Sequence, residues 1–220
     1  MIRIPCLIIG YLIGCIQTAY ITGKKKANID IREKGSGNAG TTNIVREFGL
    51  KTGVFVLLAD ISKAMLAFLL CGWLFAFTGT DTLLLGFYAG LGVVIGHDFP
   101  FFLRFKGGRG IASSIGVMIC ADWRAGLIIA AIGVALIAAT RFVSLGSVVM
   151  LALLPIFMLI LGKGPEVAVL ALILSALAIF QHRGNIKRLL DGTERKINFK
   201  KKEETVNDYS NETGSNRPGH

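Results

Sequence analysis

The stretch from Val54 to Phe77 reads VFVLLADISKAMLAFLLCGWLFAF, an almost unbroken run of apolar residues. Its only charged residues are Asp60 and Lys63. The run reaches the roughly 17 to 25 residues with which an apolar helix crosses a bilayer. A soluble domain has little room to hide such a helix, so this stretch predicts a membrane span.

Similar apolar blocks recur along the chain, which is 53% hydrophobic with a mean hydropathy of +0.61. A removable signal peptide does not explain them, because the blocks repeat and no A-x-A-like cleavage site follows the first. Several blocks are short for a perpendicular helix, so five full spans are the alternative to about seven. The sequence predicts an all-α, polytopic membrane bundle with candidate spans at 2–22, 53–77, 82–99, 110–121, 125–140, 144–161 and 165–181.

The positive charges between these blocks indicate the orientation of the bundle. Most of the 24 Lys and Arg residues lie in alternate gaps and after the last block. Only Arg3, Arg124 and Lys163 fall in the remaining gaps, and Lys63 lies inside a span. Because cytoplasmic loops carry the excess of Lys and Arg, we expect the N-terminus outside and the C-terminus inside.

The formal net charge of +10 does not indicate a nucleic-acid-binding protein. Such proteins carry Lys and Arg on a soluble surface, whereas here these residues fill the gaps between apolar blocks. We expect residues 1–197 to form one membrane domain and residues 198–220 to form a disordered polar tail on the cytoplasmic side. No CxxC spacing occurs, so we interpret the cysteines as packing residues and expect no metal or cofactor: Cys6, Cys15, Cys71 and Cys120.

The first inner segment reads GSGNAGTTNIVR from Gly35 to Arg46. Its glycines allow backbone N–H groups to turn inward, its short polar side chains donate hydrogen bonds, and Arg46 supplies a positive fork for a phosphate or carboxylate. The GxGxxG spacing does not indicate a dinucleotide site, because no strand precedes it and no acidic residue lies near Phe55. The expected anion-binding residues are Gly35, Ser36, Gly37, Asn38, Gly40, Thr42, Asn43 and Arg46.

The second inner segment reads GHDFPFFLRFKGGRG from Gly96 to Gly110. A glycine-rich turn that leads into a helix near Ile111 is a common anion site. Anchoring at the membrane surface would explain the cations but not the glycines, and His97 with Asp98 forms either an interfacial cap or part of the site. The expected anion-binding residues are Lys106, Gly107, Gly108, Arg109 and Gly110.

The third inner segment reads QHRGNIKRLLDGTERK from 181 to 196. His182 and Asn185 are three residues apart and share a helix face if the preceding helix continues through them. Ser144, in the remaining inner turn, either donates to a phosphate or caps the next helix. We expect Ser144, His182 and Asn185 to join the anion site.

Two further features concern packing inside the bundle. The pair Asp60 and Lys63 lies on one helix face, where it is either structural or directed at the site. Glycines four residues apart allow helices to approach closely. The expected packing pairs are Gly10 with Gly14, Gly86 with Gly90, and Gly92 with Gly96.

At these three segments the sequence resembles the PlsY family of bacterial acyl-phosphate:glycerol-3-phosphate acyltransferases. The family patterns are GSGNxGATNxxR, GHxFPxFLxFKGGKG and HRxNIxRLxxGxE. The chain offers GSGNAGTTNIVR at 35–46, GHDFPFFLRFKGGRG at 96–110 and HRGNIKRLLDGTE at 182–194. The order and spacing agree up to about Lys196.

The resemblance implies an inner-membrane enzyme of seven helices with a cytoplasmic active site. It implies transfer of a fatty acyl group from acyl phosphate to the 1-hydroxyl of sn-glycerol 3-phosphate, giving lysophosphatidic acid and phosphate. A monomer linked functionally to an acyl-phosphate-producing enzyme is expected. Carried over residue by residue, the catalytic set is Ser36, Arg46, Ser144, His182 and Asn185, with Arg109 lining the site.

The chain departs from the family pattern in three places. Thr41 replaces Ala, and Arg109 replaces Lys. In the first span, Gly-Cys15-Ile-Gln17 stands where the family has Gly-Ser-Ile-Pro. Arg109 keeps the positive charge but is larger and bidentate. The departures leave a change of kinetics or of substrate open.

A transporter or binding protein for an organic anion is the alternative function. Transporters place their sites near the bilayer midplane and show internal repeats, whereas here the polar segments share one face and no repeat is visible. We therefore favour an enzyme that works by positioning and electrostatic stabilisation, with His182 or a substrate phosphate accepting the proton.

Overall fold

The computed structural model describes residues 1–197, and the predicted tail at 198–220 lies outside the described residues. Within residues 1–197 the chain is helical and contains no strand. The helices are α1 (Arg3–Gly14), α2 (Thr18–Ala27), η1 (Ile31–Glu33), α3 (Thr41–Leu74), η2 (Ala76–Thr78), α4 (Thr82–Asp98), η3 (Phe101–Leu103), α5 (Ile111–Ala121), α6 (Trp123–Thr140), α7 (Val143–Ile160), α8 (Pro165–Gln181) and α9 (Arg183–Leu190).

The predicted all-α membrane bundle is confirmed, and each of the seven predicted spans is mostly helical. The first of them, 2–22, is broken at Cys15–Gln17, between α1 and α2. By length and composition, 5 helices can cross a membrane, with α1 and α2 taken as one, and the bent pair of α8 and α9 makes up to 6. The remaining apolar helix, α5, has 11 residues and is short for a span. The count of seven therefore stays a prediction.

The two glycine pairs on α1 and α4 bring these helices into backbone contact. A Cβ added at Gly10 would lie 2.0 Å from the carbonyl oxygen of Ala89, and one at Gly14 would lie 2.2 Å from that of Val93. Likewise, a Cβ added at Gly92 or Gly96 would collide with the backbone carbonyl of Leu7 or Tyr11 in α1. The predicted packing role of these pairs is confirmed.

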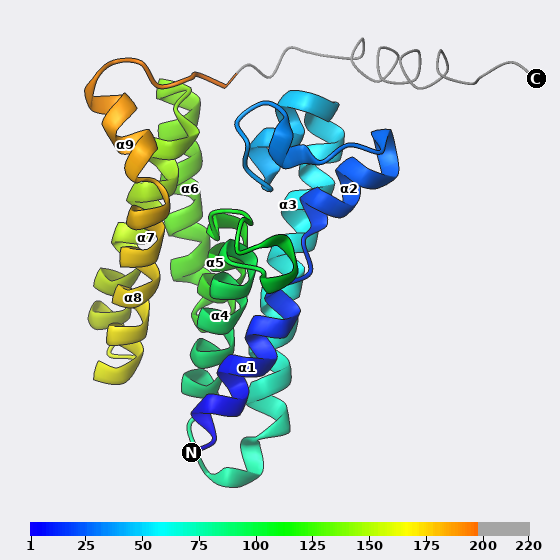
Figure 1. The fold of residues 1–220 in the computed structure, drawn as a ribbon. Helices are drawn as coiled ribbons and strands as arrows, with labels where there is room; N and C mark the ends of the chain where they lie inside the picture. Colours follow the sequence, from blue (N-terminus) through cyan, green and yellow to red (C-terminus); the bar gives the residue numbers. More distant parts are fainter. Residues whose placement is uncertain (198–220) are drawn as a thin grey trace, which may run out of the picture.

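Three helices are interrupted, and all three interruptions lie toward the same end of the bundle (Figure 1). α1 gives way to α2 across Cys15–Gln17, Gly49 has non-helical dihedral angles inside α3 (φ 80°, ψ 173°), and α8 meets α9 at a bend of 60°. The N-terminus lies at the opposite end. The interruptions turn the ends of α2, α3 and α9 away from the long helix axes.

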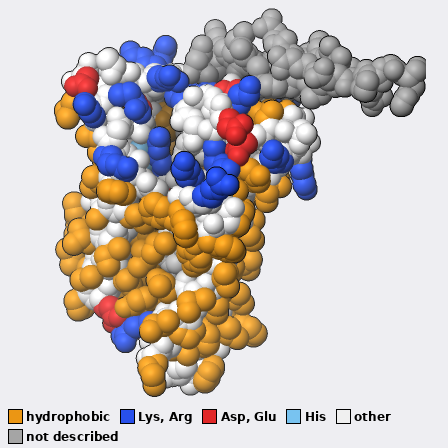
Figure 2. Space-filling view, viewed as in Figure 1, with side chains coloured by type: hydrophobic (Ala, Val, Ile, Leu, Met, Phe, Trp, Pro, Cys, Tyr) orange, Lys and Arg blue, Asp and Glu red, His pale blue; other side chains and the backbone are white. Residues whose placement is uncertain are grey.

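The surface divides into an apolar belt and a charged end (Figure 2). The belt carries large exposed side chains such as Trp73, Phe77 and Leu159, as expected of a surface in contact with lipid. Lys and Arg gather at the end that bears α2 and α9 (Figures 1 and 2). The charge asymmetry seen in the sequence is therefore an asymmetry between the two ends of the bundle.

Because a side chain at Gly10 would meet the backbone of α4, we expect Gly10→Val to destabilise the bundle by about 1–3 kcal/mol. The measurement is the thermal unfolding midpoint of the purified protein in detergent. Ile8→Val, on the exposed side of the same helix, is the matched control and should leave the midpoint nearly unchanged. Equal midpoints for the two variants would contradict the close helix contact.

Candidate active site

A cavity of about 580 Å³ lies between α3, α5, α6 and α7 at the charged end. One part of its lining is apolar and includes Leu57, Ile115, Val134 and Met150. Another part is polar and cationic. The sequence-predicted residues that line it are Gly35, Ser36, Asn38, Gly40, Thr42, Arg46, Arg109, Gly110, Ser144, His182 and Asn185. All five predicted catalytic residues thus meet in one cavity.

The side chain of Asn43 supports the backbone of the first loop with hydrogen bonds. Its Oδ1 accepts a hydrogen bond from the N–H of Ser36 at 2.8 Å, and its Nδ2 donates to the carbonyls of Ile31 and Lys34 at 2.9 and 3.0 Å. Gly35, with φ +58°, has no room for a Cβ beside Asn43 Oδ1. Asn43 is buried and does not line the cavity. The structure therefore places it as a support for the loop, and Gly37 also lies outside the cavity lining.

The glycines of the second segment serve close packing. The N–H of Gly107 donates to the carbonyl of Asp98 at 3.0 Å, and the N–H of Gly108 donates to that of His97 at 2.9 Å. These donors are used within the protein, which corrects the expectation that they face an anion. Lys106 is exposed and, like both glycines, lies outside the cavity lining.

Arg109 extends from this turn into the cavity wall. Burial, together with the positive charges of Arg188 and Arg46, lowers the pKa of Arg109 from its ordinary value, although an arginine stays charged. Several cations without an equal number of acids make the polar end of the cavity attractive to an anion.

His182 lies at the 60° bend between α8 and α9, so α8 does not continue unbroken through His182 and Asn185, the condition under which the two would share its face. Its Nδ1 is 2.9 Å from the carbonyl oxygen of Ala178. Because a carbonyl only accepts, Nδ1 carries the proton, and in the neutral ring Nε2 is the acceptor. The bend brings a potential proton acceptor to the cavity.

Ser144 does not cap α7, because Phe142 holds the capping position and no side-chain capping bond forms. The hydroxyl of Ser144 instead donates to Glu194 Oε1 at 2.9 Å. Glu194 also accepts from Asn185 Nδ2 at 2.6 Å and from Arg188 Nε at 2.8 Å. Glu194 thus ties α7 to α9 at the cavity wall.

Glu194 was not among the predicted site residues, although it is the last position of the third motif. Arg188 and Arg195 line the cavity as well. Burial alone would raise the pKa of Glu194, but hydrogen bonds from Asn185, Ser144 and Arg188 hold it below its ordinary value of 4.5. The carboxylate is therefore ionised near neutral pH.

His97 and Asp98 are buried, with exposed fractions of 3% and 2%, so the interpretation of both as an interfacial cap is wrong. His97 lies beside the ion pair of Asp60 and Lys63. Asp60 and His97 reach the cavity wall, whereas Lys63 does not. The pair is thus both structural and close to the site.

Replacement of Glu194 by Gln should weaken the link between α7 and α9 at neutral pH. A depressed pKa means that the carboxylate stabilises the folded protein above about pH 4.5 and that this stabilisation is lost as the pH falls through the lower folded-state pKa. The thermal midpoint of Glu194→Gln should lie below that of the parent at pH 7, and the two should converge as the pH falls through the lower folded-state pKa. A difference that grows toward acid pH would contradict this account.

Comparison with known proteins gives a consistent picture across sequence and structure. The family model described as glycerol-3-phosphate acyltransferase matches residues 4–192. A glycerol-3-phosphate acyltransferase of Clostridioides difficile strain 630 is 45% identical over 194 residues, covering 88% of this chain and 95% of the relative. One of Thermoanaerobacter sp. strain X514 is 46% identical over 200 residues, covering 91% and 98%.

Two crystal structures of the integral membrane glycerol 3-phosphate acyltransferase PlsY (YgiH) share this fold. The glycerol 3-phosphate form has a TM-score of 0.80 and 32% identity, covering 89% of this chain and 96% of that one. The lysophosphatidic acid form has a TM-score of 0.79 and 31% identity, covering 90% and 96%.

Proposed function

The chain belongs to the glycerol-3-phosphate acyltransferase family and is an acyltransferase of that kind, and we propose how its cavity carries out the reaction. The observation that carries the proposal is the convergence of Ser36, Arg46, Arg109, His182 and Asn185 in a cavity whose remaining lining is largely apolar. Such a cavity suits substrates that join a phosphate to a hydrocarbon chain. The same observation favours the enzyme over a transporter of organic anions.

The acyl donor is acyl phosphate. Its phosphate binds the cationic part of the cavity, and its hydrocarbon chain binds the apolar part. The phosphate takes the cationic end near Arg46 and Arg109, and the acyl chain lies along the apolar wall of α6 and α7. Glycerol 3-phosphate brings a second phosphate to the same end. Two dianionic groups in one site account for a polar end that carries several arginines.

The reaction is a direct acyl transfer. The 1-hydroxyl oxygen of glycerol 3-phosphate attacks the acyl carbon, the bond between that carbon and the bridging phosphate oxygen breaks, and phosphate leaves with the electron pair. The hydroxyl proton goes to Nε2 of His182 or to a phosphate oxygen. Asn185 and Ser144, both held by Glu194, orient the glycerol phosphate. Positioning and stabilisation of negative charge supply most of the rate.

Ser36 donates a hydrogen bond to a phosphate oxygen. Acyl phosphate is already activated, so the transfer needs no acyl-serine intermediate. The Ser36 hydroxyl stands in a loop whose backbone is fixed by Asn43, which suits a fixed donor. Gly35, Asn38, Gly40 and Thr42 form the same wall and complete the anion site.

The charged end faces the cytoplasm of the cell membrane, with the N-terminus outside. The placement of most Lys and Arg at that end supports this orientation. Residues 1–197 act as one domain and as a monomer, and an acyl-phosphate-producing enzyme supplies the donor. Both substrates reach the cavity from the inner side, the acyl phosphate along the membrane surface.

The donor is tested with purified protein, palmitoyl phosphate and labelled glycerol 3-phosphate. Labelled lysophosphatidic acid and an equal amount of phosphate should appear, and palmitoyl-CoA in place of palmitoyl phosphate should give none. Transfer from palmitoyl-CoA, with none from palmitoyl phosphate, would overturn the proposed donor.

Removal of the Ser36 hydroxyl tests its role as a phosphate donor. Loss of one hydrogen bond to a charged group corresponds to about 1.5–3 kcal/mol, so Ser36→Ala should lower kcat/KM by roughly 10- to 100-fold. Near-normal turnover would remove Ser36 from the mechanism. An acyl group trapped on Ser36 and seen by mass spectrometry would replace direct transfer with a two-step reaction.

A further inference from the structure

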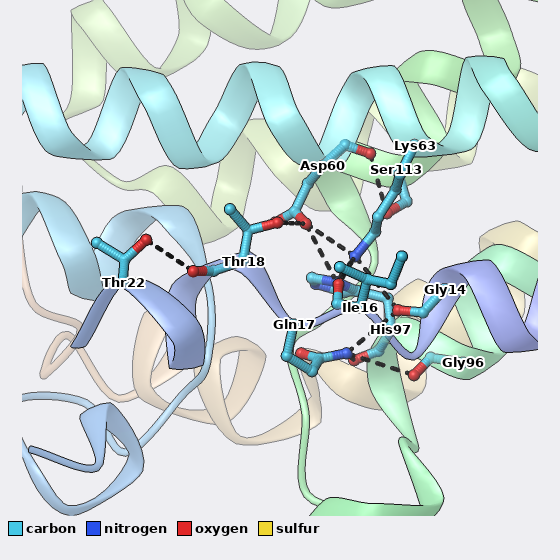
Figure 3. A network of polar contacts seen from close by, with 10 residues as sticks. All are labelled: Gly14, Ile16, Gln17, Thr18, Thr22, Asp60, Lys63, Gly96, His97 and Ser113. Carbon is cyan, nitrogen blue, oxygen red and sulfur yellow. Dashed lines mark hydrogen bonds and ion pairs between the residues drawn. The ribbon is translucent and has the colours of Figure 1, made fainter. Parts of the chain in front are cut away.

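Asp60, Lys63 and His97 form a buried polar network that takes no part in the reaction proposed above (Figure 3). Asp60 and His97 reach the cavity wall. Lys63 Nζ lies 2.8 Å from Asp60 Oδ1 and 2.9 Å from His97 Nδ1. The exposed fractions are 1% for Asp60, 7% for Lys63 and 3% for His97. Charged groups inside a membrane bundle are costly, so a buried network of this kind calls for a function.

On one side, the network holds the break between α1 and α2. Lys63 Nζ donates to the carbonyl of Ile16 at 2.7 Å and to that of Gly14 at 3.3 Å. The hydroxyl of Thr18, in the first turn of α2, donates to Asp60 Oδ1 at 3.0 Å. Carbonyls released by the break thus find partners within the protein, as a low-dielectric surrounding requires.

Gln17 joins the same break to α4. Its Nε2 donates to the carbonyl of His97 at 3.0 Å and to that of Gly96 at 3.4 Å (Figure 3). Gln17, one of the positions at which the chain departs from the family pattern, is therefore an anchor for His97. The ring of His97 is thus held by Lys63, and its backbone carbonyl is held by Gln17.

On the other side, His97 and Asp98 support the turn that carries Arg109. The carbonyls of His97 and Asp98 accept from Gly108 and Gly107, and a Cβ at Gly108 would lie 2.0 Å from His97 Nε2. A Cβ at Gly110 would lie 3.1 Å from the Asp98 carboxylate. Arg109 is thus flanked by two glycines that pack on this pair of side chains.

We infer that Asp60, Lys63 and His97 are positioning residues that fix the turn of residues 107–110 and thereby aim Arg109 at the substrate phosphate. The ammonium of Lys63 can only donate, so it orients the ring of His97 with Nδ1 as the acceptor. With the ring fixed, its Nε2 edge sets how closely Gly108 can approach. The inference rests on the proposed phosphate-binding role of Arg109.

Lys63 gives the cleanest test because it does not line the cavity and so acts only through its neighbours. Arg109→Ala should raise KM for one of the two phosphate substrates. Lys63→Met should raise the same KM by about tenfold or more, with a smaller change in kcat, since loss of a charged hydrogen bond is of that order. In the double variant the two effects should not multiply, because both act through Arg109.

The matched control is Tyr88→Phe, which removes the hydrogen bond of 2.8 Å from Tyr88 to Glu166, between α4 and α8, away from the site. It should lower the thermal midpoint in detergent and leave both KM values unchanged. An unchanged KM in Lys63→Met, or effects of Lys63→Met and Arg109→Ala that multiply in the double variant, would overturn the inference.

If Lys63→Met does not give a folded protein by gel filtration, a comparison at His97 decides. His97→Asn keeps an oxygen that can accept from Lys63, whereas His97→Leu does not, so His97→Asn should have the lower KM of the two. Equal KM values would overturn the inference. Loss of turnover in the parent protein would instead count against the proposed function, which separates the two failures.

Discussion

The structure depends on one constraint, that backbone N–H and C=O groups inside a membrane need partners within the protein. Long helices meet this need by themselves, but a polar site needs irregular backbone. The described part of the chain resolves the conflict by interrupting α1–α2, α3 and α8–α9 toward a single end. At the α1–α2 break the freed carbonyls of Gly14 and Ile16 are met by the side chain of Lys63.

The same end concentrates positive charge and uses little acid to offset it. Arg46, Arg109 and Arg188 stand around the cavity, and Glu194 holds Arg188 together with Ser144 and Asn185. The carboxylate therefore organises the wall without neutralising the site. A cationic end joined to an apolar cavity matches a substrate that is a phosphate at one end and a hydrocarbon at the other.

Much of this could be read from the sequence. Hydropathy located the apolar helices, and the distribution of Lys and Arg identified the charged end. The three motifs, together with the inner turn that bears Ser144, contained the catalytic set that the cavity brings together. Span count and orientation stay predictions, because length and charge do not place a helix such as α5 relative to a bilayer.

The site details that the sequence analysis predicted wrongly or missed share one physical cause, which is that they depend on contacts formed only in the folded chain. Asn43 and Gly107 resemble ligand-binding residues in composition, but their partners, Lys34 and Asp98, come close only in the fold. Periodicity indicates a helix but does not show the bend at His182. Glu194 stood in a quoted motif, yet its role depends on Ser144, far away in sequence.

The central claim is that one cavity holds the phosphate at its arginines and the acyl chain along its apolar wall. The most direct measurement is a crystal structure of the protein with a non-hydrolysable acyl phosphonate and glycerol 3-phosphate. We expect the phosphonate within hydrogen-bond distance of Arg46 or Arg109 and the acyl chain against Ile115 and the buried Met150. An acyl chain on the outer surface of the bundle, or a phosphonate bound away from both arginines, would contradict it.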